Sequence, residues 1–175
     1  MDPLCNKFCM FLNTDDMYDP ELAMVKNRIV GGTLALWFAS LDPYVTIHQP
    51  STSSHTALIL AMPGYTVSIH VVIYLPTSGR ECDFISELAC LKICLTELAD
   101  QYPGSPLYIR GDCNVNKNNK NRTIIFQQFL DSLCLLRVDI QHNTYHHFTG
   151  EGLYDSEIDV ILFQDFPGVL EHVTK

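Results

Sequence analysis

Apolar positions along the first half of the chain have the short spacing of β-strands. Four runs rich in β-branched and aromatic residues are predicted strands: residues 33–38, 45–48, 55–62 and 65–75. Pro63-Gly64 separates the last two runs and is a turn signal, which predicts an antiparallel hairpin. Within the last run, His70, Val72 and Tyr74 alternate with aliphatic residues, so the pattern places these three side chains on one face.

The second half of the chain contains two helical patterns. Between residues 84 and 100, bulky apolar residues recur at spacings of three and four and form one stripe. The stripe consists of Phe84, Leu88, Leu91, Leu95 and Leu98. Asp83 is the predicted N-cap. A second amphipathic helix is predicted near residues 123–133, between strands at 107–110 and 158–163. A hairpin combined with strand–helix–strand units predicts an α/β (α+β) sandwich rather than a doubly wound sheet.

Residues 1–30 have no clean period and carry an acidic cluster at 15–21. We therefore predict an irregular N-terminal segment over residues 1–30 and one domain over residues 31–175. No apolar run reaches the roughly 18–20 residues of a membrane-spanning helix, and residues 1–12 lack the features of a signal peptide. The seven cysteines include no C-x-x-C pair, and the spacing of Cys90 and Cys94 fits core thiols within the helical pattern. This favours a reduced, intracellular protein over a disulfide framework or a zinc site.

The composition limits how the chain could bind a polyanion. Of its 175 residues, 11 are Lys or Arg and 20 are Asp or Glu, which gives a formal charge of −9. Hydrophobic residues make up 47% of the chain, which is enough for one core and argues against intrinsic disorder. The overall field of so negative a chain does not attract nucleic acid. A polyanionic substrate would therefore need a local basic patch or bound cations.

Polar residues with useful chemistry follow the strand at 107–110. Asp112 and Asn114 are two positions apart, so on an extended chain their carboxylate and amide would point to one side. That pair suits an activated water beside a phosphate, with the carboxylate handling the proton and the amide donating to an oxygen. The alternative is an ordinary loop, since Asp and Asn are common after strands.

Two further residues occupy notable strand positions. Asp159 lies within an apolar strand, where a carboxylate is costly to bury without a partner such as a histidine, a hydroxyl or a metal-bound water. A solvent-facing position on an edge strand would also explain it. Tyr74 ends the strand at 65–75, where its phenol could reach a phosphate oxygen or simply pack against its neighbours.

The order of these segments resembles the endonuclease/exonuclease/phosphatase superfamily. The sequence reads Y-L-P, then a predicted helix, G-D-x-N, T-Y-H-H and S-x-I-D-x-I-L. With the phrase GG-T-L-A-L-W at residues 31–37, it is most similar to the endonuclease domains of LINE-like retrotransposons. The resemblance covers residues 31–163 and implies two mixed sheets packed face to face with flanking helices, incomplete at the N-terminus.

The resemblance also implies roles for individual residues. Asp112 would activate the attacking water, Asn114 and Tyr74 would contact the phosphate, and Asp159 would orient a catalytic histidine. Ser156 and Thr144 would have supporting roles. It further implies Mg²⁺ as cofactor, DNA as substrate with nuclear localisation, and a reverse-transcriptase domain in the parent polyprotein. No membrane association is implied.

The sequence departs from the family pattern at both ends. Domains of the family begin with a strand that ends in a metal-site Asn, followed by a helix and by a strand that ends in a metal-ligand Glu. Neither of these two strand ends is recognisable within residues 1–30. The family's domains end with an S/D-H pair, whereas Glu171 precedes His172 here. We therefore expect a partial domain with little or no Mg²⁺-dependent nicking. Two alternatives are a degenerate remnant without hydrolysis and a phosphatase acting on a small phosphorylated molecule or a phosphoinositide.

Candidate contacts to DNA come from a basic tract and a histidine cluster. Lys117, Lys120 and Arg122 follow G-D-x-N and are the only concentrated positive charge in the sequence, so they could meet phosphates near the cut. A solvated loop is the alternative for all three. His146, next to Tyr145, could line a DNA-facing loop. The histidines of this cluster, at positions 142, 146 and 147, have no Cys or carboxylate partners at the spacing of a zinc site.

Overall fold

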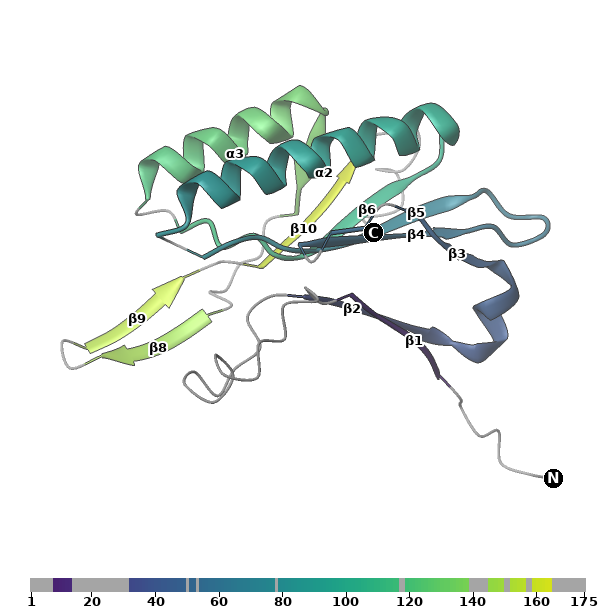
Figure 1. Ribbon diagram of the computed structural model, residues 1–175, viewed down its shortest axis with the longest axis horizontal. Coiled ribbons are helices and arrows are strands. Elements are labelled where there is room, and N and C mark those ends of the chain that lie inside the picture. Colours follow the sequence, from purple (N-terminus) through teal and green to yellow (C-terminus); the bar gives the residue numbers. More distant parts are fainter. Residues whose placement is uncertain are drawn as a thin grey trace, which may run out of the picture.

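The computed structural model describes residues 8–13, 32–49, 51–52, 54–77, 79–116, 119–138, 145–149, 152–156 and 159–164. Its centre is a mixed six-stranded sheet with the strand order β3-β4-β5-β6-β10-β7 (Figure 1). These strands span Val45–Ile47, His55–Leu60, Ser68–Tyr74, Leu107–Asp112, Asp159–Gln164 and Leu135–Arg137, in that order across the sheet. Neighbouring strands are antiparallel except β5 and β6, which are parallel.

Two helices cover one face of this sheet (Figure 1). Helix α2 (Glu81–Gln101) connects the parallel strands β5 and β6, as a parallel crossover requires, and α3 (Lys120–Ser132) follows β6. The whole predicted stripe of α2 is buried against the sheet. Since the sheet residues facing the helices are also apolar, for example Val71, Ile109 and Leu162, the main core lies between helices and sheet.

A two-stranded sheet lies against the opposite face (Figure 1). Strands β1 (Phe8–Asn13) and β2 (Thr33–Phe38) are antiparallel, and the 3₁₀ helix η1 (Ala39–Tyr44) connects β2 to β3. The inner residues Asn13 and Thr33 contact the six-stranded sheet at Thr56, with 2.6 Å between the two threonine hydroxyls. Six apolar side chains, each 46–65% exposed, form what we term the outer face of β1–β2: Phe8, Met10, Leu12, Leu34, Leu36 and Phe38.

This architecture confirms the predicted α/β sandwich. The predicted strands are confirmed as β2, β3, β4, β5, β6 and β10, and the hairpin at Pro63-Gly64 joins β4 to β5. Strands β1, β7 and the hairpin β8–β9 (Tyr145–Thr149 and Gly152–Ser156) were not anticipated. The irregularity predicted for residues 1–30 is therefore wrong at Phe8–Asn13, because an unbroken apolar run hides the alternation of a strand.

The helix termini also differ from prediction. Helix α2 begins at Glu81 and Asp83 lies in its first turn, so Asp83 is not the N-cap. Its carboxylate instead accepts a hydrogen bond of 2.7 Å from Arg80 Nε. Helix α3 is capped by Asn119, whose side chain accepts from the backbone N–H of Arg122. Of the two cysteines that the sequence assigned to the core of this helix, Cys94 is buried and Cys90 is exposed, so only Cys94 is a core thiol.

No helix among the described residues is both long and apolar enough to cross a membrane.

Candidate active site

Three of the predicted site residues form a row across neighbouring strands. Tyr74 at the end of β5 pairs with Asp112 at the end of β6, and Asp112 pairs with Asp159 at the start of β10. Paired residues share a face of the sheet, and adjacent strands are about 4.8 Å apart. The backbone positions of Tyr74 and Asp159 are therefore separated by roughly 10 Å, on the face opposite the helices.

Gly111 allows the strands that carry this row to approach closely. Its φ of 138° is unfavourable for residues with a side chain, and an added Cβ would lie 2.0 Å from the carbonyl oxygen of Ile73. Directly after the row, the backbone N–H of Leu75 donates to the carbonyl oxygen of Asp112 at 2.9 Å. The ends of β5 and β6 are thereby held together where the polar residues begin.

Asn114 lies beside Asp112, but by a different route from the one predicted. Asn114 adopts a left-handed φ of 50°, and its backbone N–H donates to Asp112 Oδ1 at 2.8 Å. Its side-chain Nδ2 donates to the carbonyl oxygen of Leu75 at 2.8 Å. The prediction of an extended chain is therefore wrong, because the backbone turns after the buried Cys113, but the Asn114 side chain still lies beside the Asp112 carboxylate.

Burial controls the electrostatics of the row. Loss of solvent raises the pKa of Asp112 to about 6, hydrogen bonds from Asn114 oppose the rise, and the charge of Asp159 adds to it. A carboxyl group that titrates near neutral pH can exist in both protonation states under ordinary conditions, which is useful for proton transfer. Burial also raises the pKa of the Cys113 thiol to about 11, so this cysteine is not a thiolate nucleophile.

The predicted DNA-contact residues have different fates. Arg122 is completely buried, so the prediction that it contacts DNA is wrong. Lys120 is exposed at the start of α3 and remains a candidate, whereas Lys117 lies outside the described residues. His146 belongs to β8 and Ser156 ends β9, in a hairpin that precedes β10. Thr144 lies outside the described residues.

Two residues near the row were missed by the sequence analysis. Arg110 is exposed on β6, two positions before Asp112 and on the same face, which makes it a cation close to the row. Strand alternation alone could have identified it. Asn13 ends β1, which corrects the statement that residues 1–30 contain no strand ending in Asn. Its amide donates to the carbonyl oxygens of Thr52 and His55, near the same end of the six-stranded sheet as Tyr74.

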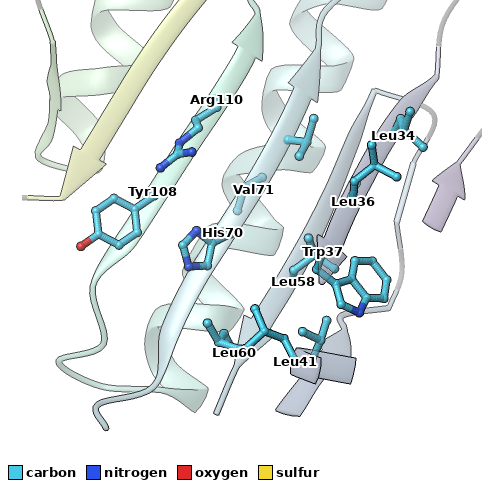
Figure 2. Close-up of a pocket in the computed structure, with 13 residues that line it drawn as sticks. Leu34, Leu36, Trp37, Leu41, Leu58, Leu60, His70, Val71, Tyr108 and Arg110 are labelled. Carbon is cyan, nitrogen blue, oxygen red and sulfur yellow. The ribbon is translucent and has the colours of Figure 1, made fainter. Parts of the chain in front are cut away.

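A cavity of about 370 Å³ lies between β2 and the six-stranded sheet (Figure 2). Trp37 and Leu58 contribute to its apolar walls, while His70, Tyr108 and Arg110 contribute polar groups. The rings of His70 and Tyr108 stack with centroids 5.3 Å apart, and burial, with a smaller effect of Arg110, lowers the pKa of His70. Because Tyr108 and Arg110 alternate with the core on the strand that ends at Asp112, the cavity and the row share one face.

The described residues of the row have too few carboxylates to hold a magnesium ion by protein ligands alone. Asp112 and Asp159 are two carboxylates on neighbouring strands, but no group of three or more His, Cys, Asp or Glu side chains among the described residues could hold a metal ion. Mg²⁺ commonly binds through one or two carboxylates together with substrate phosphates. The donor set therefore fits an ion that needs the substrate's phosphate and does not form a cage of protein ligands alone.

The α/β sandwich of this chain is shared with solved structures of the endonuclease/exonuclease/phosphatase family, so the chain has this fold. Among solved structures, it matches the endonuclease domain of TRAS1, a telomere-specific non-LTR retrotransposon, with a TM-score of 0.66 and 15% identity over 90% of this chain and 67% of that one. The superfamily resemblance seen in the sequence is thereby confirmed at the level of fold.

Two other solved structures share the fold. A mannosyl-6-phosphatase from Bacteroides thetaiotaomicron matches with a TM-score of 0.57 and 11% identity, over 90% of this chain and 62% of that one. D. rerio TDP2 complexed with single strand DNA product matches with a TM-score of 0.51 and 11% identity, over 91% of this chain and 63% of that one. No protein-family model and no curated protein matches the sequence. The chain thus spans between 62% and 67% of the length of these three structures.

Proposed function

We propose that the row of Tyr74, Asp112 and Asp159 binds a phosphodiester of DNA and takes part in its hydrolysis by water. The domain would be of retroelement origin. The observation that carries the proposal is the register, which brings residues far apart in the sequence to adjacent strand ends. The fold shared with the TRAS1 endonuclease domain and with a TDP2 complexed with single strand DNA product supports DNA as the substrate class.

Each residue then has a chemical task. Asp112 accepts the proton of the attacking water, since its pKa of about 6 suits a general base near neutral pH. Tyr74 and Asn114 bind phosphate oxygens, and Asp159 orients a histidine. Arg110 and Lys120, both exposed, offer positive charge to neighbouring phosphates. A divalent cation brought with the phosphate would neutralise negative charge at this site.

A specific observation favours a second form of the proposal, in which the site binds DNA and cleaves it weakly. The described strand before the GG-T-L-A-L-W phrase, β1, ends in Asn13, which is an amide and not a carboxylate, and this amide donates to protein oxygens. Without a third carboxylate among the residues that the structure describes, a cation is held less firmly. We therefore expect binding with little nicking by this chain.

The test combines a binding assay with a nicking assay. A fluorescent oligonucleotide reports binding, and supercoiled plasmid with Mg²⁺ or EDTA reports nicking, each for the unmodified chain, Asp112→Asn and Tyr74→Phe. Binding weakened at least tenfold in Tyr74→Phe, without robust nicking, supports the weakly cleaving form. Robust Mg²⁺-dependent nicking lost in Asp112→Asn supports a competent hydrolase. Absence of both binding and nicking would contradict the proposal.

The fold shared with a mannosyl-6-phosphatase supports one alternative substrate class, a small phosphorylated molecule. Phosphate release from mannose 6-phosphate, in the absence of any effect on DNA, would favour it.

A further inference from the structure

Arg122, which the sequence analysis made a candidate DNA contact with a solvated loop as the alternative, is an extensively hydrogen-bonded side chain. It is completely buried, and its guanidinium makes four hydrogen bonds of 2.7–2.9 Å. The carbon of the guanidinium also lies 4.2 Å from the centre of the Phe84 ring. Removing a charged guanidinium from water costs free energy, and hydrogen bonds and an opposite charge must compensate for it. Such a compensated burial points to a defined role for Arg122.

The hydrogen-bond partners of Arg122 come from three separate segments of the chain. Nη1 donates to the carbonyl oxygens of Pro76 and Asn114, and Nη2 donates to that of Thr77. Nε donates to the carboxylate of Glu81 in the first turn of α2, and this bond lowers the pKa of Glu81. Pro76 and Thr77 follow β5, while Asn114 follows β6. One side chain from α3 therefore connects both strand-end loops to the start of α2.

These two loops are the ones that follow Tyr74 and Asp112. The loops also contact each other directly, through Leu75 N–H to Asp112 and Asn114 Nδ2 to Leu75. Each of these two hydrogen bonds fixes a single contact between the loops, whereas the guanidinium of Arg122 bonds to three loop carbonyls at once. The guanidinium is planar and rigid, so it fixes the positions of its three carbonyl partners relative to one another.

We propose that Arg122 is a positioning residue of the candidate active site, which holds the loop after β5 and the loop after β6 at the spacing that keeps Tyr74, Asp112 and Asn114 in one arrangement. It acts from the helix side of the sheet and touches no substrate. The inference deepens the proposed function, but its structural content concerns the free protein and can be tested without DNA.

The alternative is that Arg122 stabilises the domain as a whole, like any well-packed core residue. The two roles differ in where the molecule opens when the guanidinium is lost. A positioning role predicts local opening at the two loops, whereas a general core role predicts the same loss of protection throughout. Hydrogen exchange of individual amides distinguishes these outcomes.

The main experiment measures native-state hydrogen exchange of the unmodified chain, Arg122→Lys, and the control Arg80→Lys. Arg80 is an exposed arginine whose guanidinium pairs with Asp83 of α2, so its replacement makes the same change at a side chain that bonds to the helix and not to the loop carbonyls of Pro76, Thr77 and Asn114. In Arg122→Lys, we expect the protection of the Leu75 and Asn114 amides to fall at least tenfold more than that of Tyr102, which bonds within the end of α2. Arg80→Lys should change none of them by more than about twofold. Equal losses at all three amides, or no loss, would overturn the proposal.

A second measurement needs no variant and covers the case in which Arg122→Lys does not fold. In the unmodified chain, the exchange of the Arg122 Nε–H should follow the same denaturant dependence as the Leu75 and Asn114 amides, because they open together. An Nε–H that exchanges only with global unfolding, while the loop amides open locally, would contradict the proposal. Since neither measurement uses DNA, a failure of the proposed function leaves both results interpretable.

Discussion

Replacement of Asp112 by Asn should stabilise the protein, and only above acidic pH. Burial raises the pKa of Asp112 to about 6 from an ordinary value of 3.8. Because this folded-state pKa exceeds the unfolded value, the unmodified chain loses stability as the pH rises through this window, whereas the Asn variant does not. Asn retains an oxygen that can accept the hydrogen bond from the Asn114 N–H.

The magnitude follows from the shift. A change of about 2 pKa units corresponds to about 3 kcal/mol. Asp112 is only partly buried, so solvent screening reduces the expected gain to about 1–2 kcal/mol. The difference between the two proteins should thus be near zero at about pH 4 and reach this value above about pH 7.

The assay is urea unfolding of both proteins at several pH values, with Asp100→Asn as the control. Asp100 is exposed near the end of α2, so its replacement removes the same charge from the surface. A gain for Asp112→Asn that did not change with pH, or a loss of stability at neutral pH, would refute the argument that this carboxylate is held in a site at a cost to folding.

Three further outcomes are expected. Gly111→Ala should destabilise the protein by about 2 kcal/mol or more in urea unfolding, because the new Cβ would collide with the Ile73 carbonyl, while Gly64→Ala, with open space around it, should cost less. Leu91→Ala should lower the free energy of unfolding by about 2–5 kcal/mol, since Leu91 is fully buried on the sheet-facing side of α2; a loss below about 1 kcal/mol would contradict the core described above. The chain should self-associate through the outer face of β1–β2, so light scattering at rising salt should increase for the unmodified chain and less for Met10→Lys; a monodisperse monomer would refute this.

The sequence predicted the core well because the core depends on local periodicity. The stripe of α2 and the alternation along β5 bury what their spacing says they should. The row at the strand ends was also accessible, since Tyr74 and Asp112 each end a recognisable apolar run. The pairing register that aligns them is not contained in either run, and it needed the structure.

The failures share a physical cause, namely contacts between residues distant in the sequence. Arg122 is 45 and 46 residues from the carbonyls of Thr77 and Pro76 that compensate its burial, so its polar surroundings in the sequence indicated an exposed side chain that contacts DNA or solvent. Strand β1 was hidden because apolar residues occupy both of its faces. The left-handed backbone at Asn114 cannot be inferred from the i, i+2 spacing that placed it near Asp112.

The central claim is that Tyr74, Asp112, Asn114 and Asp159 form one site for a DNA phosphodiester. The most direct measurement is a titration of ¹⁵N-labelled protein with a short single-stranded oligonucleotide in Mg²⁺, followed by amide chemical shifts. The account predicts that the amide shifts of all four residues saturate with a single dissociation constant. Titration with the corresponding free nucleosides, which lack phosphate, should cause no such shifts. Shifts confined to the outer face of β1–β2, or no shifts at the row, would contradict it.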